Sequence, residues 1–337
     1  LMPTAASEEF RRSIVEGDHL LVVADEVHQI GSEKNARFLR VNSGPRLGLS
    51  ATPKRFGDPE GTQRIFDYFG AVVPPVITLA DAVDAGRLVQ YEYFLHPVHL
   101  TASEADEWSK QSRAITLEIA RQKTDEDGRK PLSDRAKMLL IKRARIAKKA
   151  EGKTRLAAEI VAQAYKDGQA WLIYCEDGGQ LADVMIALRE AGLNPIEYHS
   201  EMPGDRDATM EWFRSFGGVL VSIRCLDEGV DIPAVSHALI LASSQNPRQF
   251  IQRRGRVLRK SPGKDLAVIH DAIVVPTDSN DDEDQMGLLR AELVRSVEFA
   301  THALNRSAGA ELRDIAIRLG IDPDGIAGET GEEEDDA

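Results

Sequence analysis

The chain has 337 residues, 42% of them hydrophobic, which is enough for two globular domains with separate cores. No apolar run approaches the ~20 residues of a membrane-spanning helix, so the composition excludes an integral membrane protein. The two cysteines, Cys175 and Cys225, fall in or beside predicted buried strands, with no second thiol at metal-ligand spacing. This usage argues against a zinc site or a disulfide framework and predicts a cytoplasmic protein.

The net charge of −13 is concentrated in two acidic runs. Eleven carboxylates in residues 278–284 and 329–336 leave only −2 for the rest of the chain. Between Lys130 and Arg155, ten Lys and Arg residues stand against two acidic ones, a local charge of +8. An acidic chain is therefore compatible with a polyanionic partner.

The first hundred residues predict an incomplete α/β domain. Leu20–Ala24 and Arg46–Leu49 have the pattern of short buried strands, with a helix across Glu33–Arg40 between them. Tyr91–Val98 is predicted to be a returning strand that closes this domain, which we place at residues 1–100. Residues 101–155 are charged, rich in alanine and poor in β-branched residues, so we expect a helical insertion or linker.

A second strand–helix rhythm follows and predicts a second α/β domain over residues 156–276. Repeated units of this kind indicate a doubly wound parallel sheet, with functional residues at the carboxyl ends of its strands. The predicted strands are Trp171–Cys175, Pro195–Tyr198, Gly218–Ser222, Ala238–Leu241 and Leu266–His270, and the predicted helices are Gly179–Ala191, Asp205–Phe216 and Pro247–Leu258. Beyond them we expect an acidic linker (277–285), C-terminal helices (286–324) and a disordered acidic tail (325–337).

Two clusters of charged residues point to phosphoryl-transfer chemistry. Asp25-Glu26-Val27-His28 directly follows an apolar run, and carboxylates at a strand end can hold a hydrated magnesium ion. In a helix, Gln252, Arg256 and Arg259 would share one face, where arginines can neutralise a transferring phosphoryl group. The alternatives are a helix cap with a solvated glutamate, and a solvated basic helix.

With Ser50-Ala51-Thr52 and Glu228-Gly229-Val230-Asp231 between them in order, these clusters make the chain resemble a superfamily 2 helicase or translocase, a motor with two RecA-like domains. The four stretches resemble motifs II, III, V and VI. Spacing and flanks are closest to the DExH branch that includes XPB-like proteins and the motor subunits of restriction systems. The resemblance covers roughly residues 1 to 275 and implies an α/β fold with two doubly wound sheets, the first incomplete.

The resemblance also implies roles for these residues. Asp25 would hold Mg²⁺ through water, and Glu26 would orient the attacking water. Arg256 and Arg259 would be arginine fingers, with Gln252 contacting water or the γ-phosphate. The coupling and nucleotide-binding positions would be His28, Ser50, Thr52, Gly229 and Asp231. His28 as a simple hydrogen-bonded histidine, and Ser50 to Thr52 as a turn that ends a strand, stay open as alternatives. Ile223 stands where many relatives carry a threonine, which puts one hydroxyl contact to nucleic acid in doubt.

The phosphate-cradling Walker A loop of such motors is missing from this pattern. The sole Gly-Lys-Thr, at residues 152–154, has Ala147 where the loop needs a glycine, and it lies in a helical pattern. We interpret it as a coincidence on a helix surface. The chain is therefore expected to be the C-terminal part of a motor whose loop lies in a missing N-terminal segment or a partner protein.

The basic stretch offers a candidate contact to nucleic acid. Arg143, Arg145, Lys148 and Lys149 could bind phosphates, although a charge-rich helix can also be merely solvated. The sequence thus predicts an ATP- and Mg²⁺-dependent helicase or translocase that acts on nucleic acid, DNA being favoured over RNA. The alternative is a degenerate, non-catalytic module that binds nucleic acid or a partner protein without hydrolysing ATP.

Overall fold

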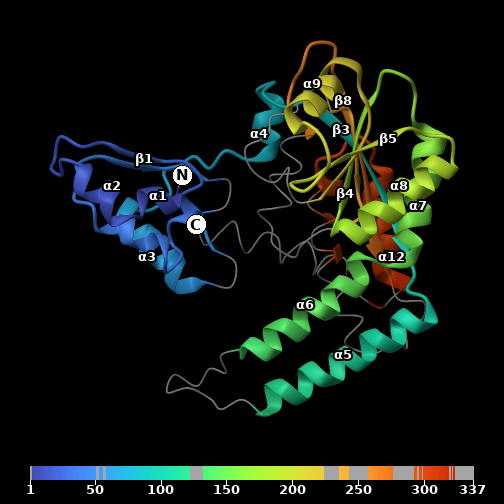
Figure 1. The fold of residues 1–337 in the computed structure, drawn as a ribbon, viewed down its shortest axis with the longest axis horizontal. Helices are drawn as coiled ribbons and strands as arrows, with labels where there is room; N and C mark the ends of the chain where they lie inside the picture. The colour runs from blue at the N-terminus through green and yellow to red at the C-terminus, as the bar shows by residue number, and fades with distance from the viewer. Residues whose placement is uncertain are drawn as a thin grey trace. The chain divides into compact units, whose positions relative to one another are not determined.

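The computed structural model describes residues 2–50, 53–55, 58–121, 132–223, 235–242, 257–275, 292–293, 296–297, 299–318, 320 and 322. The chain divides into two compact units with a boundary after Thr78 (Figure 1). Each unit contains its own parallel sheet, one of two strands and one of six. The predicted α/β class is therefore confirmed.

The first unit is built around two short parallel strands, in which Val23 lies opposite Leu47. Its elements are α1 (Met2–Ala5), α2 (Glu8–Ser13), β1 (Val22–Ala24), the 3-10 helices η1 (Val27–Gln29) and η2 (Asn35–Arg40), β2 (Arg46–Gly48) and α3 (Pro59–Phe69). Both predicted strands are confirmed. The helix predicted over Glu33–Arg40 is a shorter 3-10 helix.

Only one face of this small sheet is buried. Ala24 packs with Val27, Ile30 and Ile65 in a small core. On the other face, four apolar side chains are 46–58% exposed: Leu21, Val23, Leu47 and Leu49. The prediction that both strands are buried is therefore wrong for this face.

The second unit contains six parallel strands in the order β3-β8-β7-β4-β6-β5. Their bounds are β3 (Gln90–Val98), β4 (Ala170–Cys175), β5 (Pro195–Tyr198), β6 (Gly218–Ile223), β7 (His237–Ile240) and β8 (Leu266–Val274). The five strands predicted between residues 171 and 270 are all present. The residues of β4 are buried throughout because the strand lies in the middle of the sheet, between β7 and β6.

Strand β3 corrects the predicted organisation. We expected Tyr91–Val98 to close the first domain, but β3 pairs with β8 in the second sheet, with Gln90 opposite Leu266 and Val98 opposite Val274. Strand β3 therefore belongs to the second sheet, although the helical segment that follows it separates it in the chain from the other five strands of that sheet.

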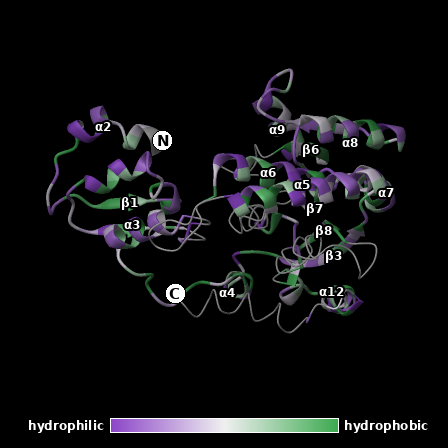
Figure 2. Cartoon of the chain, turned by 90° about the horizontal axis from the view of Figure 1, so that it is seen from below, coloured by the Kyte–Doolittle hydropathy of each residue, from purple (hydrophilic) through white to green (hydrophobic). Residues whose placement is uncertain are grey.

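Helices cover the second sheet and extend from it. They are α4 (Leu79–Asp84), α5 (Ala102–Arg121), α6 (Asp134–Lys148), α7 (Glu151–Ala164), α8 (Gly178–Glu190), α9 (Arg206–Phe216) and α12 (Ser307–Arg318). The apolar sides of α7 and α8 pack on Trp171, Ile173 and Cys175 of β4, while hydrophilic residues lie on other parts of these helices (Figure 2). Helices α5 and α6 lie side by side (Figure 1), as expected for a helical insertion.

The remaining predicted segments lie largely outside the described residues. These are the helix Pro247–Leu258 up to residue 256, the acidic linker, the acidic tail and part of the C-terminal helices. In the parts of the chain that the structure describes, no helix is both long and apolar enough to cross a membrane.

Candidate functional site

The end of β1 presents two carboxylates in a sharp turn. Asp25 is exposed, and one of its carboxylate oxygens accepts a hydrogen bond of 2.9 Å from the backbone N–H of Glu26. Glu26 has φ 49° and ψ 49°, a left-handed conformation that costs a residue with a side chain about 1–2 kcal/mol. The turn leads directly into η1, so the position of the Glu26 carboxylate is set by the backbone as well as by packing.

The ends of β1 and β2 bring three predicted site residues together. The backbone of Leu49 links the strands, because its N–H donates to the carbonyl of Ala24 at 2.8 Å and its carbonyl accepts from Val27 N–H at 3.0 Å. As a result His28 Nδ1 lies 3.1 Å from Ser50 Oγ and 3.3 Å from Glu26 Oε2. One buried imidazole nitrogen thus faces both a carboxylate and a hydroxyl.

This shared nitrogen can link the two predicted motifs. A neutral imidazole carries one N–H, so Nδ1 can donate to Glu26 or to Ser50, or it can accept from the serine hydroxyl. Only the first arrangement gives the Glu26 carboxylate a hydrogen bond from the imidazole. A movement of Ser50 would therefore change the surroundings of Glu26.

Arg55 and Asp58, which sequence reasoning missed, brace the backbone of this site. The guanidinium of Arg55 donates to the carbonyl of His28 and, at 2.7 Å, to Asp58 Oδ2. Asp58 also caps α3 by accepting from Gly61 N–H at 2.8 Å. Burial acts to raise the pKa of Asp58, but its hydrogen bonds from Arg55 and Gly61 bring that pKa below its ordinary value. The Asp58-Pro59 pair at the helix start was a usable signal for the cap.

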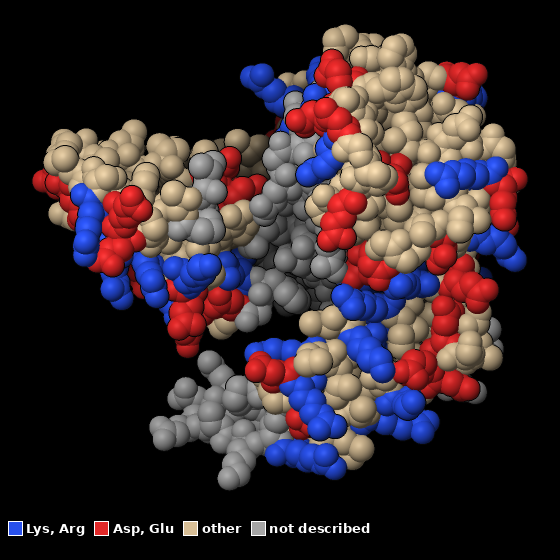
Figure 3. Space-filling view, in the orientation of Figure 1, with Lys and Arg blue, Asp and Glu red and all other residues tan. Residues whose placement is uncertain are grey.

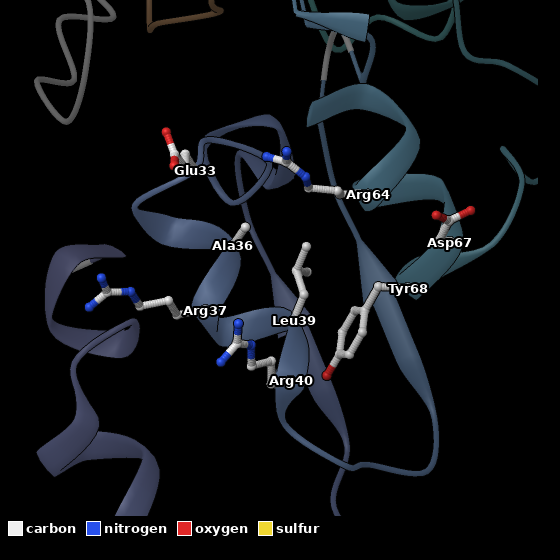
Figure 4. Close-up of a pocket in the computed structure, with 8 residues that line it drawn as sticks. All are labelled: Glu33, Ala36, Arg37, Leu39, Arg40, Arg64, Asp67 and Tyr68. Atoms are coloured by element: carbon white, nitrogen blue, oxygen red, sulfur yellow. The ribbon is translucent and has the colours of Figure 1, made fainter. Parts of the chain in front are cut away.

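A surface hollow of about 580 Å³ lies elsewhere in the first unit, between η2 and α3 (Figure 4). Arg37 and Arg40 come from η2, and Arg64, Asp67 and Tyr68 come from α3. None of the predicted nucleotide-binding residues lines it. Its mixture of positive and negative side chains identifies no ligand class.

In the second unit, the carboxyl end of β4 holds a cluster of ion pairs. Glu176 is buried, with Lys148 Nζ 3.2 Å and Arg145 Nε 3.9 Å from its carboxylate oxygens. Asp177 lies 3.0 Å from Lys149 Nζ and caps α8. Burial acts to raise the pKa of Asp177, but hydrogen bonds from Gln180 N–H and Lys149 hold it below the ordinary value.

These contacts change the expectation for the basic helix. Arg143 donates to Ser112 Oγ at 3.0 Å and lies over the ring of Trp108, 5.1 Å from its centroid. Lys148 is only 17% exposed, so a solvated helix face is the wrong description for these two side chains. Arg145 and Lys149 are more exposed, at 56% and 37%. Figure 3 shows basic side chains over the α5–α6 hairpin with acidic ones among them. Contact with nucleic acid remains a prediction.

The Gly-Lys-Thr at residues 152–154 lies in α7, as predicted, but not on its surface. Lys153 is 3% exposed, and its Nζ donates to the carbonyl of Leu241 at 2.7 Å. A Cβ on Gly152 would approach Val98 of β3 to 2.8 Å. The glycine and lysine therefore serve close packing against the sheet.

Among the residues predicted to contact the nucleotide from motifs V and VI, the structure describes Arg259. Its side chain is exposed, and its backbone forms an antiparallel bridge with Leu88. Five predicted site residues lie outside the described ranges: Thr52, Gly229, Asp231, Gln252 and Arg256. Within those ranges, no group of three or more His, Cys, Asp or Glu side chains could hold a metal ion.

The sequence is similar to known helicases and translocases. Residues 152–261 match the family model described as the helicase conserved C-terminal domain. The DNA 3'-5' translocase XPB2 of Sulfurisphaera tokodaii is 25% identical over 269 residues, which cover 74% of this chain and 57% of the relative. A putative DNA 3'-5' helicase Rad25 of Halobacterium salinarum is 28% identical over 286 residues, covering 83% of this chain and 40% of the relative. The chain thus spans about half the length of these relatives.

A solved structure has a related fold. The ATP-dependent Type ISP restriction-modification enzyme LlaBIII bound to DNA superimposes with a TM-score of 0.54 at 16% identity, covering 88% of this chain and 21% of that one. At this identity the likeness concerns the fold alone. The family model and the curated relatives confirm the resemblance to superfamily 2 helicases and translocases that the motifs indicated.

Proposed function

We propose that this chain, a distant homologue of the XPB and Rad25 translocases with a superfamily 2 helicase C-terminal domain, is the C-terminal portion of an ATP-dependent DNA helicase or translocase. Its two units would be RecA-like domains, the first of them partial. DNA is favoured over RNA because the two relatives described above, which match 74% and 83% of this chain, are a DNA translocase and a putative DNA helicase. The buried thiol of Cys175 suits a cytoplasmic protein.

The observation that carries the proposal is the junction of Glu26, His28 and Ser50 at the ends of two parallel strands. Carboxyl ends of such strands are where α/β proteins bind ligands. Asp25 is exposed there and offers the single carboxylate, acting through water, that suits Mg²⁺ on a nucleotide. Bound Mg²⁺ would neutralise charge on the phosphates. The adjacent Glu26 would orient the attacking water and accept its proton.

The arginines of the second unit would complete this chemistry. Arg256 and Arg259 would stabilise negative charge that develops on the transferring phosphoryl group, and Gln252 would help to place the water. Gly229 and Asp231 would approach the nucleotide from the same unit. The exposed side chain of Arg259 agrees with this role.

The loop that cradles the β- and γ-phosphates would come from residues outside this chain. Two observations support this part of the proposal. Lys153, in the sole Gly-Lys-Thr, is buried in α7 and bonded to a backbone carbonyl. The apolar face of β1 and β2 around Val23 and Leu47 is exposed, which is typical of a sheet that lacks part of its covering layer.

The test is ATP hydrolysis by the complete protein, expressed from its full reading frame, compared with residues 1–337 alone. We expect Mg²⁺-dependent turnover that duplex or single-stranded DNA stimulates, and no appreciable turnover by residues 1–337. Robust hydrolysis by residues 1–337 would contradict the external phosphate loop. DNA binding by the complete protein without any hydrolysis would instead favour the non-catalytic module.

A further inference from the structure

Residues 257–259, which include the proposed arginine finger Arg259, are held by contacts to their backbone carbonyls. Val257 is helical, and the chain turns at Leu258. In this chain the carbonyls of three successive residues, 257 to 259, each find a partner from another part of the second unit.

A tight turn brings Lys264 to two of these carbonyls. The N–H of Lys264 donates to the carbonyl of Ser261 at 3.0 Å, and Gly263 has φ +78°. Proline at the second position and a glycine with positive φ at the third are the signature of a type II turn. The turn reverses the chain, so the lysine side chain points back along the segment it has just left.

The Lys264 ammonium is buried and bonded to backbone. Its Nζ donates to the carbonyl of Val257 at 2.5 Å and to that of Arg259 at 2.9 Å. Only 8% of the residue is exposed, and burial lowers the pKa of Lys264 to about 8. Burying a cation is costly unless strong acceptors compensate, and these two backbone carbonyls provide them.

A second contact holds the carbonyl of Leu258, which lies between Val257 and Arg259 in the chain. Val89 N–H donates to the carbonyl of Leu258 at 2.8 Å, and Leu88 forms a bridge with Arg259. The backbone of Arg259 is therefore held on two sides, by Lys264 and by the strand that begins near Leu88. Its side chain remains exposed.

We propose that Lys264 is a positioning residue for ATP hydrolysis, whose ammonium holds the backbone carbonyls of Val257 and Arg259 so that the side chain of Arg259 projects in a fixed direction. This inference rests on the proposed function. Lys264 itself would touch no substrate. It would restrict the orientations of the Arg259 side chain before ATP binds. Less conformational entropy would then be lost when the transition state forms.

The test compares Lys264→Met, which keeps the length and removes the donors, with Lys264→Arg, which restores donors and charge. Lys260→Met is the matched control, because Lys260 is an exposed lysine of the same segment. Hydrogen exchange of residues 1–337 reports on the clamp without requiring activity. In the complete protein, kcat and KM for ATP report on positioning.

For Lys264→Met we expect exchange at residues 258–261 to accelerate at least about tenfold while the amides of β4 and β6 stay protected. We expect kcat to fall at least about tenfold with KM for ATP nearly unchanged, because Arg259 would stabilise the transition state less well while ATP still binds. Lys264→Arg should recover part of both effects, and Lys260→Met should show neither.

Two results would overturn the proposal. One is a uniform loss of protection across the sheet, which would make Lys264 a general stabilising residue. The other is an unchanged kcat despite local opening. If Lys264→Met does not fold, Lys264→Gln, which keeps a neutral donor, is held to the same criteria. A wild-type protein without ATPase activity would refute the proposed function, while hydrogen exchange would still show whether the clamp exists.

Discussion

Glu26 is the residue at which the sharpest functional prediction can be made. In the complete protein, Glu26→Gln should reduce ATP hydrolysis at least about a hundredfold, because a carboxamide keeps the shape of the side chain but cannot take a proton. ATP binding, measured with a fluorescent nucleotide, should be nearly unchanged. The control is Glu33→Gln, an exposed glutamate of the same unit. Near-normal turnover in Glu26→Gln would remove Glu26 from the proposed chemistry.

Ser50 allows the link between the two strand ends to be tested. Ser50→Ala removes the hydroxyl 3.1 Å from His28 Nδ1, so the imidazole N–H would be left to Glu26. We expect DNA stimulation of ATP hydrolysis to fall more than the basal rate, because the coupling path is broken while Glu26 remains. Ser32→Ala, which removes a hydroxyl bonded to the carbonyl of Gln29, is the control. An equal fall in the basal and stimulated rates would argue against coupling.

Some basic side chains at the C-terminal end of α6 pack against the rest of the second unit and others are more exposed. The sequence alone does not distinguish the two groups. Arg143 and Lys148 contact Trp108, Ser112 and the buried Glu176, whereas Arg145 and Lys149 are more exposed. Changing Arg143 and Lys148 to Gln should lower the free energy of unfolding by about 2 kcal/mol, because a buried carboxylate would be left without its nearest cation. Urea denaturation measures this decrease, and Lys137→Gln, at an exposed position of α6, is the control.

The more exposed residues, Arg145 and Lys149, allow DNA binding to be tested. Changing Arg145 and Lys149 to Gln should weaken binding to unrelated DNA sequences and flatten its salt dependence, by roughly 0.7 to 0.9 in the log–log slope for each phosphate that is no longer neutralised. Fluorescence anisotropy of a labelled strand at several salt concentrations gives the slope. An unchanged slope would mean that Arg145 and Lys149 do not bind phosphates and that α6 has a structural role only.

At the level of elements, local patterns predicted strands well and their partners poorly. Pro195–Tyr198 was predicted with its observed bounds because turn residues flank a short run of strand-forming residues. The residues that pair with β3 lie 176 positions away in sequence, and a periodicity over ten residues contains no information on such pairing.

The candidate site shows the same limit. The two predicted strands that end before Asp25 and Ser50 are present and parallel, and the structure links Glu26 and Ser50 through His28. The braces Arg55 and Lys264 were missed because each binds backbone carbonyls, which every residue has. The burial of Lys153 was missed because the carbonyl that accepts its hydrogen bond follows a strand far along the chain.

For the molecule as a whole, a group of histidines predicts how stability depends on pH. Trp171 of β4 stacks on His237 and His270, and His96 Nε2 lies 2.9 Å from His270 Nδ1. Burial lowers the pKa of His270 to about 3 and that of His237 to about 4, and it also lowers the pKa of His96. Lys166 adds positive charge near His237.

The sign follows from these pKa values. Below the ordinary pKa of 6.5 the unfolded chain binds protons that the folded chain does not, so stability is full above pH 6.5 and declines as the pH falls toward 3. Each histidine contributes up to about 1.4 kcal/mol per pH unit in this window. His270→Phe should reduce the decline measured by urea denaturation at pH 7, 6 and 5, whereas His302→Gln, at an exposed position, should not. Equal declines in wild type and His270→Phe would contradict this account.

The position of β3 beside β8 also constrains how the second unit can be made. During synthesis β3 emerges early, but the strand it pairs with is completed only at Val274. Until then β7, the other neighbour of β8, has an unpaired edge, and such edges are prone to association with other chains. Pairing between strands so distant in sequence slows folding. The edge of β7 therefore stays open until β8 has been made, and chaperone binding would be most useful in that interval.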